Sequence, residues 1–383
     1  MSYRYIGPKE VAFIVVDAPE YPPLPQNWES ILRSKIFFDQ PIGGDLRSYI
    51  RTISYGRARL TGDLYGPYPI KLPRDSNNNI SYGSIIDLGI QAAQGQIEDY
   101  SYACVVATNN RLTDWAIFNN FPRGYFYKNP DSTITDACTV DLDAPLGVWA
   151  MEVLHMLTRF GDLYGIPDSP DGYDVMDCSC GSHPSAYTKI KFGWLESNSV
   201  RNVPSDNPVT TIRIDALANP LSAGGIRAIT IEIPESNRYL LVETRLPVDK
   251  YESGNPIFSS GLPDQGVIVY LIDESSWPPV HLLKGGMKTV GESFVDQNSG
   301  IKTSIAQKVA SGFDVKIERD ISQECEHLKE DIEFLRAEIQ DLVQEYEKEE
   351  DINIKLRLQR QIREKRSQLA RLRTRAKSLG CNM

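Results

Sequence analysis

The chain has 383 residues, of which 41% are hydrophobic and 24% are charged, which is an ordinary globular composition. This length exceeds what one hydrophobic core usually organises, so we expect at least two domains. The formal net charge of −10 argues against a nucleic-acid-binding protein that relies on phosphate neutralisation. No apolar run approaches the roughly 18 residues of a membrane span, so the sequence predicts no membrane partner.

The N-terminal segment and the cysteines bear on the cellular compartment. Residues 11–16 are an apolar run of six residues, which is shorter than the core of a signal peptide. We therefore expect a soluble, cytoplasmic protein, or one that is released by a non-classical route. The six cysteines are scattered, with Cys178 and Cys180 as the only close pair in the sequence, so they predict free, partly buried thiols and no disulfide framework.

The first 200 residues alternate between strand-like and helix-like segments, which predicts an α/β arrangement. Strands are expected over the apolar or alternating segments 11–16, 54–66 and 102–108, and helices over about 44–53 and 82–94. Residues 109–143 are rich in Asn, Asp, Pro and aromatic residues and have no sustained periodicity. This composition predicts long loops that border a cleft.

Residues 147–160 are apolar nearly all round, which predicts a helix buried in a core. The exceptions are Glu152, His155 and Arg159, whose spacings of three and four place them in one polar stripe along the helix. Burying a carboxylate and an imidazole is unfavourable unless they are paired, hydrogen-bonded or bound to a metal. The stripe is therefore expected to face a cleft or an internal polar network.

After Trp194 the chain changes to short β-rich runs that are separated by clusters of Pro, Gly, Asn and Ser. This pattern predicts a β-sandwich-like domain over residues 198–319, in which no catalytic group of residues is evident. The chain then divides into residues 1–197, residues 198–319 and residues 320–383.

The last 64 residues have apolar positions spaced alternately by four and three in 328–346 and again in 358–379, which predicts a coiled-coil seam. The two runs are out of register, so the seam is interrupted near residues 349–354. Residues 320–351 carry 13 acidic and 3 basic side chains, whereas residues 352–383 carry 10 basic and one acidic. A helical hairpin within one chain, or a long helix paired antiparallel with a second chain, would bring these opposite charges together.

Signals at the interruption point both ways. The absence of Gly and Pro favours one continuous helix, while the register break and the potential N-caps Asp351 and Asn353 favour a turn. The basic stretch 355–377 is also typical of helices that bind membranes or nucleic acid, but an acidic helix of matching length favours self-pairing. The expected partner is a protein or a second copy of the chain, in a homo-oligomer or a larger complex.

Five groups of segments, in the family's order, resemble the immune-inhibitor-A family of zinc metallopeptidases. They are VAFIVVDAP at 11–19, DLRSYIRTISYGRARLTGDLYG at 45–66, MEVLHMLTRFGDLYG at 151–165, YDVMDCSCGSHPSAYTKIKFGWL at 173–195, and RYLLVETRLP with DQGVIVYLIDE at 238–247 and 264–274. The resemblance covers about residues 8–318. It implies an α+β fold: a zincin-like, metzincin-type metallopeptidase domain, then a β-sandwich-like domain, followed here by an added coiled coil or helical hairpin.

The resemblance also implies roles for residues of the predicted helix. The family holds zinc with two histidines four residues apart, and a glutamate beside the first histidine activates the metal-bound water. Glu152 corresponds to that general base, His155 to the second histidine, and Met176 to the methionine beneath the site. Met151 stands where the first histidine is expected, and a thioether is a poor ligand for zinc.

The third ligand position departs from the family pattern as well. Asp162 comes seven residues after His155, where the family's acidic residue comes six after, and Thr158 replaces a glycine. Asp162 and His155 alone make one ligand fewer than the three protein ligands of a usual catalytic zinc site.

Three residues that follow Met176 are candidates for a substitute ligand: Cys178, Cys180 and His183. The competing interpretation is that they are small or polar residues of a turn, because C-x-C-x-x-H is not a recognised ligand pattern. The competing interpretation of Met151 is a methionine that fills core space.

Three functions remain open at this point. The leading hypothesis is a catalytically inactive pseudopeptidase without a bound cofactor, which serves in protein binding or assembly through its C-terminal helices. The first alternative is an active metalloendopeptidase that hydrolyses peptide bonds with a non-standard zinc site. The second is a structural component of a larger complex.

Overall fold

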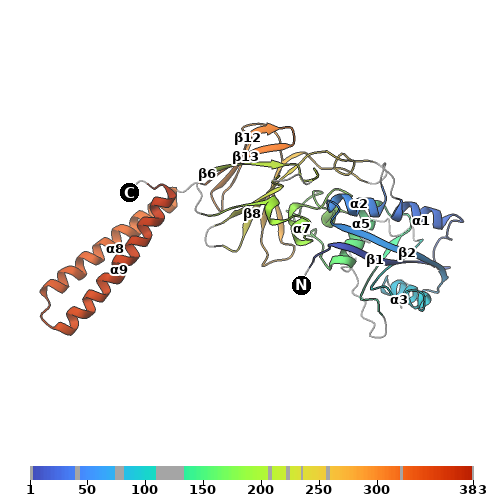
Figure 1. The fold of residues 1–383 in the computed structure, drawn as a ribbon, viewed down its shortest axis with the longest axis horizontal. Coiled ribbons are helices and arrows are strands. Elements are labelled where there is room, and N and C mark those ends of the chain that lie inside the picture. The colour runs from blue at the N-terminus through green and yellow to red at the C-terminus, as the bar shows by residue number, and fades with distance from the viewer. Residues whose placement is uncertain are drawn as a thin grey trace.

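The computed structural model describes residues 3–38, 44–73, 82–108, 133–205, 209–220, 225–233, 236–255, 259–319 and 322–381. The chain has mixed α and β structure, so the expected α+β class is confirmed. Figure 1 shows three parts in chain order along an elongated molecule: an N-terminal α/β part, a β-rich part and a projecting pair of helices. None of the helices in the described ranges is long and apolar enough to cross a membrane.

The N-terminal part is built on a four-stranded parallel sheet of order β2-β1-β3-β4. Its elements are β1 (Gly7–Asp17), α1 (Trp28–Phe37), α2 (Leu46–Ile53), β2 (Ala58–Pro69), α3 (Tyr82–Ala93), β3 (Tyr102–Ala107), β4 (Asp136–Asp141) and α5 (Leu146–Thr158). Helices α1, α2 and α5 pack in a core on one face, and α3 covers the other face. Because both faces are covered, the central strands are apolar runs, which is the pattern that predicted them.

The prediction of loops over residues 109–143 is wrong for its last part, because strand β4 lies there. All six residues of β4 are buried, and the strand pairs in parallel with β3. Asp136, Thr139 and Asp141 interrupt its apolar pattern, so periodicity gave no strand signal. Residues 109–132 lie outside the described residues.

The β-rich part consists of two sheets that share one hydrophobic cluster. Its strands are β5 (Val200–Val203), β6 (Val209–Asp215), β7 (Ala228–Glu232), β8 (Tyr239–Arg245), β9 (Gly266–Ile272), β10 (Val280–Met287), β11 (Ser293–Asp296), β12 (Ile301–Val309) and β13 (Gly312–Arg319). The sheet orders are β10-β9-β8-β7-β5 and β11-β12-β13-β6. Strands β8 and β9 also contribute Leu241, Ile268 and Tyr270 to the core of the N-terminal part, so the two parts share buried surface.

The C-terminal helices α8 (Ser322–Lys348) and α9 (Ile352–Leu379) pack on one another within the chain. The charges allowed a hairpin within one chain or a long helix paired with a second chain, and the structure has the hairpin. Asp351 caps α9, since its side chain accepts hydrogen bonds from the backbone of Asn353 and Ile354. The opposite charges of the two helices meet in the ion pair of Lys365 with Glu338, at 2.7 Å.

The cysteines differ from their predicted state. Cys325 and Cys381 form a disulfide at the base of the hairpin, and Cys178 and Cys180 form a second disulfide. Cys104 and Cys138 are the buried thiols that remain. Spacing alone missed the first pair because its members are 56 residues apart and are brought together by the hairpin turn. The cytoplasmic location stays a prediction. The two disulfides count against it, because disulfides are rare in the reducing cytosol.

We expect Cys325→Ser to destabilise the hairpin by about 2–4 kcal/mol, because the disulfide restricts the unfolded chain between its two ends. Urea unfolding followed by helical circular dichroism measures this loss. Cys381→Ser, which removes the same disulfide from its other end, is the matched control and should unfold like Cys325→Ser. Equal midpoints for the oxidised wild type and the variant would contradict the prediction.

Candidate functional site

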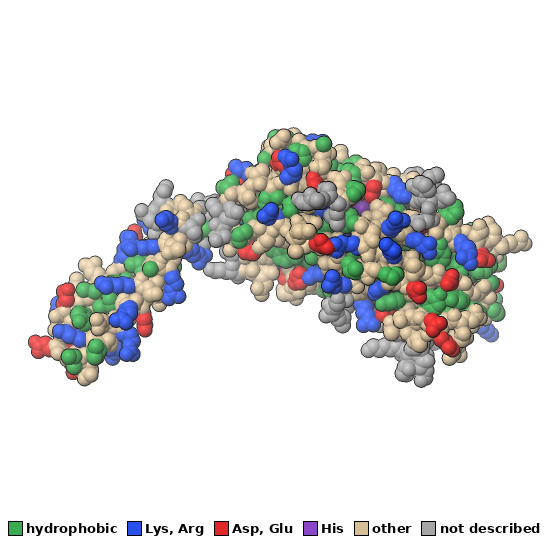
Figure 2. Space-filling model, in the orientation of Figure 1, with side chains coloured by type: hydrophobic (Ala, Val, Ile, Leu, Met, Phe, Trp, Pro, Cys, Tyr) green, Lys and Arg blue, Asp and Glu red, His purple; other side chains and the backbone are tan. Residues whose placement is uncertain are grey.

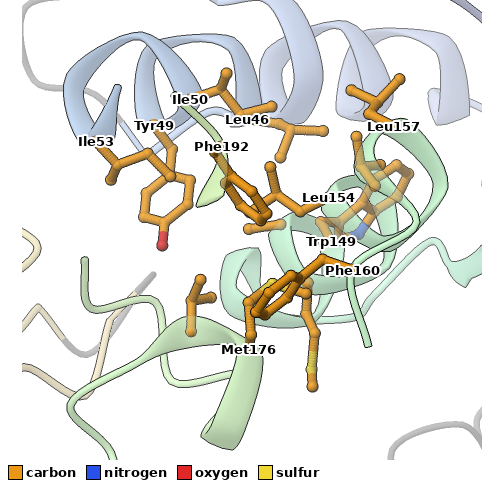
Figure 3. Packing of buried hydrophobic residues seen from close by; sticks show 14 of the residues in the cluster. Leu46, Tyr49, Ile50, Ile53, Trp149, Leu154, Leu157, Phe160, Met176 and Phe192 are labelled. Atoms are coloured by element: carbon orange, nitrogen blue, oxygen red, sulfur yellow. The ribbon is translucent and has the colours of Figure 1, made fainter. Parts of the chain in front are cut away.

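Helix α5, which carries the MEVLH sequence, lies between α2 and the segment around Met176. Figure 3 shows Leu46, Tyr49 and Ile50 of α2 on one side of Leu154 and Trp149, with Phe160 and Met176 on the other side. Eleven of the 13 residues of α5 are buried. The predicted buried helix is therefore confirmed, although it ends at Thr158 and not at residue 160.

The helix ends at Thr158 because side-chain hydrogen bonds replace the backbone hydrogen bonds that would continue it. The Thr158 hydroxyl donates to the carbonyl of Leu154, and the backbone N–H of Phe160 donates back to the same hydroxyl. Lys9 of β1 donates to the carbonyl of Leu157 at 2.6 Å and brings positive charge to the negative end of the helix dipole. Arg159 takes a left-handed conformation, with φ of 60°.

Arg159 therefore leaves the predicted polar stripe. Its guanidinium forms two hydrogen bonds with Asp136 of β4, at 2.9 and 3.0 Å. The stripe that remains consists of Glu152 and His155.

His155 is held at both ring nitrogens. Its Nε2 lies 2.8 Å from a carboxylate oxygen of Asp162, and its Nδ1 lies 2.5 Å from the carbonyl oxygen of Phe160. Burial alone would lower the pKa of His155, but the hydrogen bond to Asp162 and its charge raise that pKa to about 9. The imidazole is therefore protonated at neutral pH, and it donates from both nitrogens to these two acceptors.

Asp162 belongs to a small polar group at this end of the helix. Burial, and then the charge and the hydrogen bond of Asp162, raise the pKa of the Tyr164 hydroxyl. A Cβ atom added at Gly161 would overlap the side chain of Trp277, which belongs to the β-rich part. Trp277 also packs edge-on against Phe160, with ring centroids 5.3 Å apart. A loop of the β-rich part thus lies against the segment that carries Asp162.

Glu152 is half-buried beside this pair. Burial raises the pKa of Glu152 to about 7, while the positive charge of His155 opposes the rise and the Asp162 carboxylate adds to it. A carboxyl group with a pKa near neutrality can hold or release a proton at physiological pH. The structure thus brings Glu152, His155 and Asp162 together, as the sequence suggested.

Met151 is buried and faces a turn of the chain. The hydroxyl of Ser179 donates to its sulfur at 2.7 Å. Gly147, one helical turn earlier, contacts the backbone of residues 179–181 so closely that a Cβ atom would overlap the Ser179 carbonyl. Ser179 therefore occupies the helix face on which the first histidine of the family would stand. Sequence reasoning missed Ser179, because only the position of its neighbours, Cys178 and Cys180, drew attention.

Met176 lies beneath the helix. It is fully buried in helix α6 (Val175–Cys178), and its carbonyl accepts a 2.9 Å hydrogen bond from the backbone of Leu163. This bond joins the segment after α5 to the segment around Met176. Asp174 starts α6 by accepting from the backbone N–H of Met176.

The three candidate substitute ligands are engaged elsewhere. Cys178 and Cys180 are joined in a disulfide, so neither is a thiolate in this state. His183 is fully buried, with Nε2 2.7 Å from Asp249 and Nδ1 3.1 Å from the Lys189 ammonium. Burial, and then the charge of Lys189, lower the pKa of His183. His183 therefore belongs to a polar network behind the site.

This donor set does not fit the zinc site that the resemblance implies. Zinc needs three protein ligands, whereas here a thioether stands in the first place, and the second place is taken by an imidazole whose Nε2 is hydrogen-bonded to Asp162. Within the described ranges, no three His, Cys, Asp or Glu side chains are grouped so that they could hold a metal ion. We therefore derive no step of metal-assisted hydrolysis from this site.

No family model matches the chain, and no curated protein matches it either. The resemblance to the immune-inhibitor-A family therefore rests on the quoted segments and stays a prediction. The geometry described above stands independently of it.

We expect Glu152→Gln to remove part of the pH dependence of stability. Because folding raises the pKa of Glu152 from 4.5 to about 7, the unfolded state releases this proton first, and wild-type stability falls as the pH rises between those values. The variant should lack that fall and be more stable than wild type at pH 8 by about 2 kcal/mol. Urea unfolding at a series of pH values tests this, and parallel curves for both proteins would contradict it.

We expect Gly147→Ala to destabilise the protein by about 1–3 kcal/mol, although alanine is the better helix former. The added methyl group would overlap the Ser179 carbonyl and push residues 179–181 away from α5. Thermal unfolding measures the effect. A variant as stable as wild type would show that this packing is not as close as described.

Proposed function

We propose that the chain is a pseudopeptidase: a zincin-like metallopeptidase scaffold that lacks the zinc chemistry and serves in protein binding or assembly through its C-terminal hairpin. The observation that carries the proposal is the state of the three ligand positions. Met151 receives a hydrogen bond from Ser179, and the two ring nitrogens of His155 are hydrogen-bonded to Asp162 and to the carbonyl of Phe160. The polar residues that would hold zinc instead bond to one another.

The fold is compatible with this scaffold in its order of elements. A parallel sheet, a buried helix that bears Glu152 and His155, and a buried Met176 below it follow one another as the resemblance implies. The β-rich part then packs against the segment that carries Met176. These features support a retained scaffold, whereas the ligand positions support lost catalysis.

The hairpin supports a role in assembly. It projects from the rest of the chain and is closed by its own disulfide, so it presents long surfaces of both helices to solvent. We propose that its seam is an antiparallel two-stranded coiled coil, because the buried positions follow the spacing by four and three. Four large apolar residues of the hairpin remain exposed: Phe334, Ile352, Ile354 and Leu356.

Metal analysis of the purified wild type beside Met151→His tests the proposal. The wild type should contain no stoichiometric zinc and should not cleave casein. Met151→His should gain zinc, because it adds a histidine to His155 and Asp162, whose nearest atoms lie 2.8 Å apart. Met151→Leu is the matched control and should bind none. Zinc in the wild type, with chelator-sensitive cleavage that Glu152→Gln abolishes, would refute the proposal.

A further inference from the structure

One flank of the hairpin carries a groove lined by arginines. The residues that line it are Arg336 and Ile339 of α8 and Arg366, Leu369, Ala370 and Arg373 of α9, and its volume is about 360 Å³. Leu369 and Ile339 belong to the apolar seam and form the floor. In the part of the chain that the structure describes, no ion pair involves the three guanidinium groups, which are exposed. We call this feature the arginine groove.

A second surface of α8 is apolar and acidic, and so complements the arginine groove in charge. Phe334 is 65% exposed although it is a large apolar side chain in the middle of the helix. Glu330, Asp331 and Glu338 are its neighbours on the helix surface, since they lie four and three residues before it and four residues after it. Of these, Glu338 is paired with Lys365, and Glu330 and Asp331 are exposed. We call this feature the Phe334 surface.

The two surfaces lie on opposite flanks of the hairpin. Phe334 and Arg336 are two residues apart, which on an α-helix of 3.6 residues per turn is a rotation of about 200°. A copy of the chain therefore cannot bring its own Phe334 to its own groove. Contact between the two surfaces requires two copies, and each copy would still offer one unused surface.

We propose that the hairpins associate head to tail, with Phe334 of one copy seated in the arginine groove of the next. The ring would cover the apolar floor at Leu369, while Glu330 and Asp331 would lie against Arg366 and Arg373. Both halves of this contact occur on one chain, and they match in charge and in apolar character. A contact between two different patches is heterologous, so it builds a ring or an open filament and not a closed two-fold dimer.

This inference rests on the proposed role of the hairpin in assembly and names a second copy of the chain as its partner. Figure 2 shows that the hairpin stands apart from the other parts and that Lys and Arg side chains gather on its visible face. Aromatic and arginine residues carry most of the energy in many interfaces, so single changes should have large effects. Charge complementarity also predicts that association weakens as the salt concentration rises.

Sedimentation velocity of the full chain over a concentration series tests the proposal. The wild type should form species larger than a dimer as its concentration rises. Phe334→Lys, and separately Arg366→Ala with Arg373→Ala, should raise the apparent dissociation constant about tenfold or more. All three positions are exposed, and circular dichroism should show unchanged helix content. Arg357→Ala with Arg360→Ala is the matched control, because both arginines are exposed on the same helix as Arg366 and Arg373 but lie outside both surfaces, and it should associate like wild type.

A mixture of the two variants identifies which surfaces meet. The Phe334→Lys chain keeps its arginine groove, and the double arginine variant keeps its Phe334 surface. The mixture should therefore form a one-to-one heterodimer that does not grow further. A wild type that stays monomeric, variants that associate like wild type, or a mixture that fails to form the heterodimer would each overturn the inference. These results are independent of zinc content and casein cleavage, so failure here and failure of the pseudopeptidase proposal are distinguishable.

Discussion

The candidate site depends on the ion pairs that the buried guanidinium of Arg245 forms. It pairs with Glu243 and Glu252, and all three side chains are fully buried. It also donates to the backbone carbonyls of Tyr173 and His183, which bracket the segment that contains Met176. Charges buried in this way are tolerated only when each is paired and hydrogen-bonded. Strand β8 of the β-rich part therefore holds in place the segment that packs beneath helix α5.

A second buried cation extends this network to the N-terminal part. The Lys189 ammonium donates to the carbonyl of Ile53 at the end of α2, and it lies 3.1 Å from His183. Burial, and then the charge of Arg245, lower the pKa of Lys189 to about 7. His183 in turn contacts Asp249 of the β-rich part. The network thus joins α2, the segment around Met176 and the β-rich part, and both ring nitrogens of His183 belong to it.

The fold was predictable where one local signal dominated. Residues 11–16 and 102–107 lie in strands because both of their faces are buried. The opposite charges of residues 320–351 and 352–383 agreed with a hairpin. Strand β4 was not predicted, because its sequence contains polar residues although all of its residues are buried. In the candidate site, Glu152, His155 and Asp162 were predicted as a group, whereas the partner of Arg159 was not, because it comes from β4.

The sequence by itself determined that the MEVLH helix offers a thioether at residue 151, which is a poor ligand for zinc. It also determined the charge of each terminal helix, since that depends on composition alone. Only the tertiary structure decided the partners: Ser179 for Met151, Asp162 and Phe160 for His155, and Cys381 for Cys325. The physical reason is that hydrogen bonds and disulfides act over a few ångströms, and folding decides which residues come within that range.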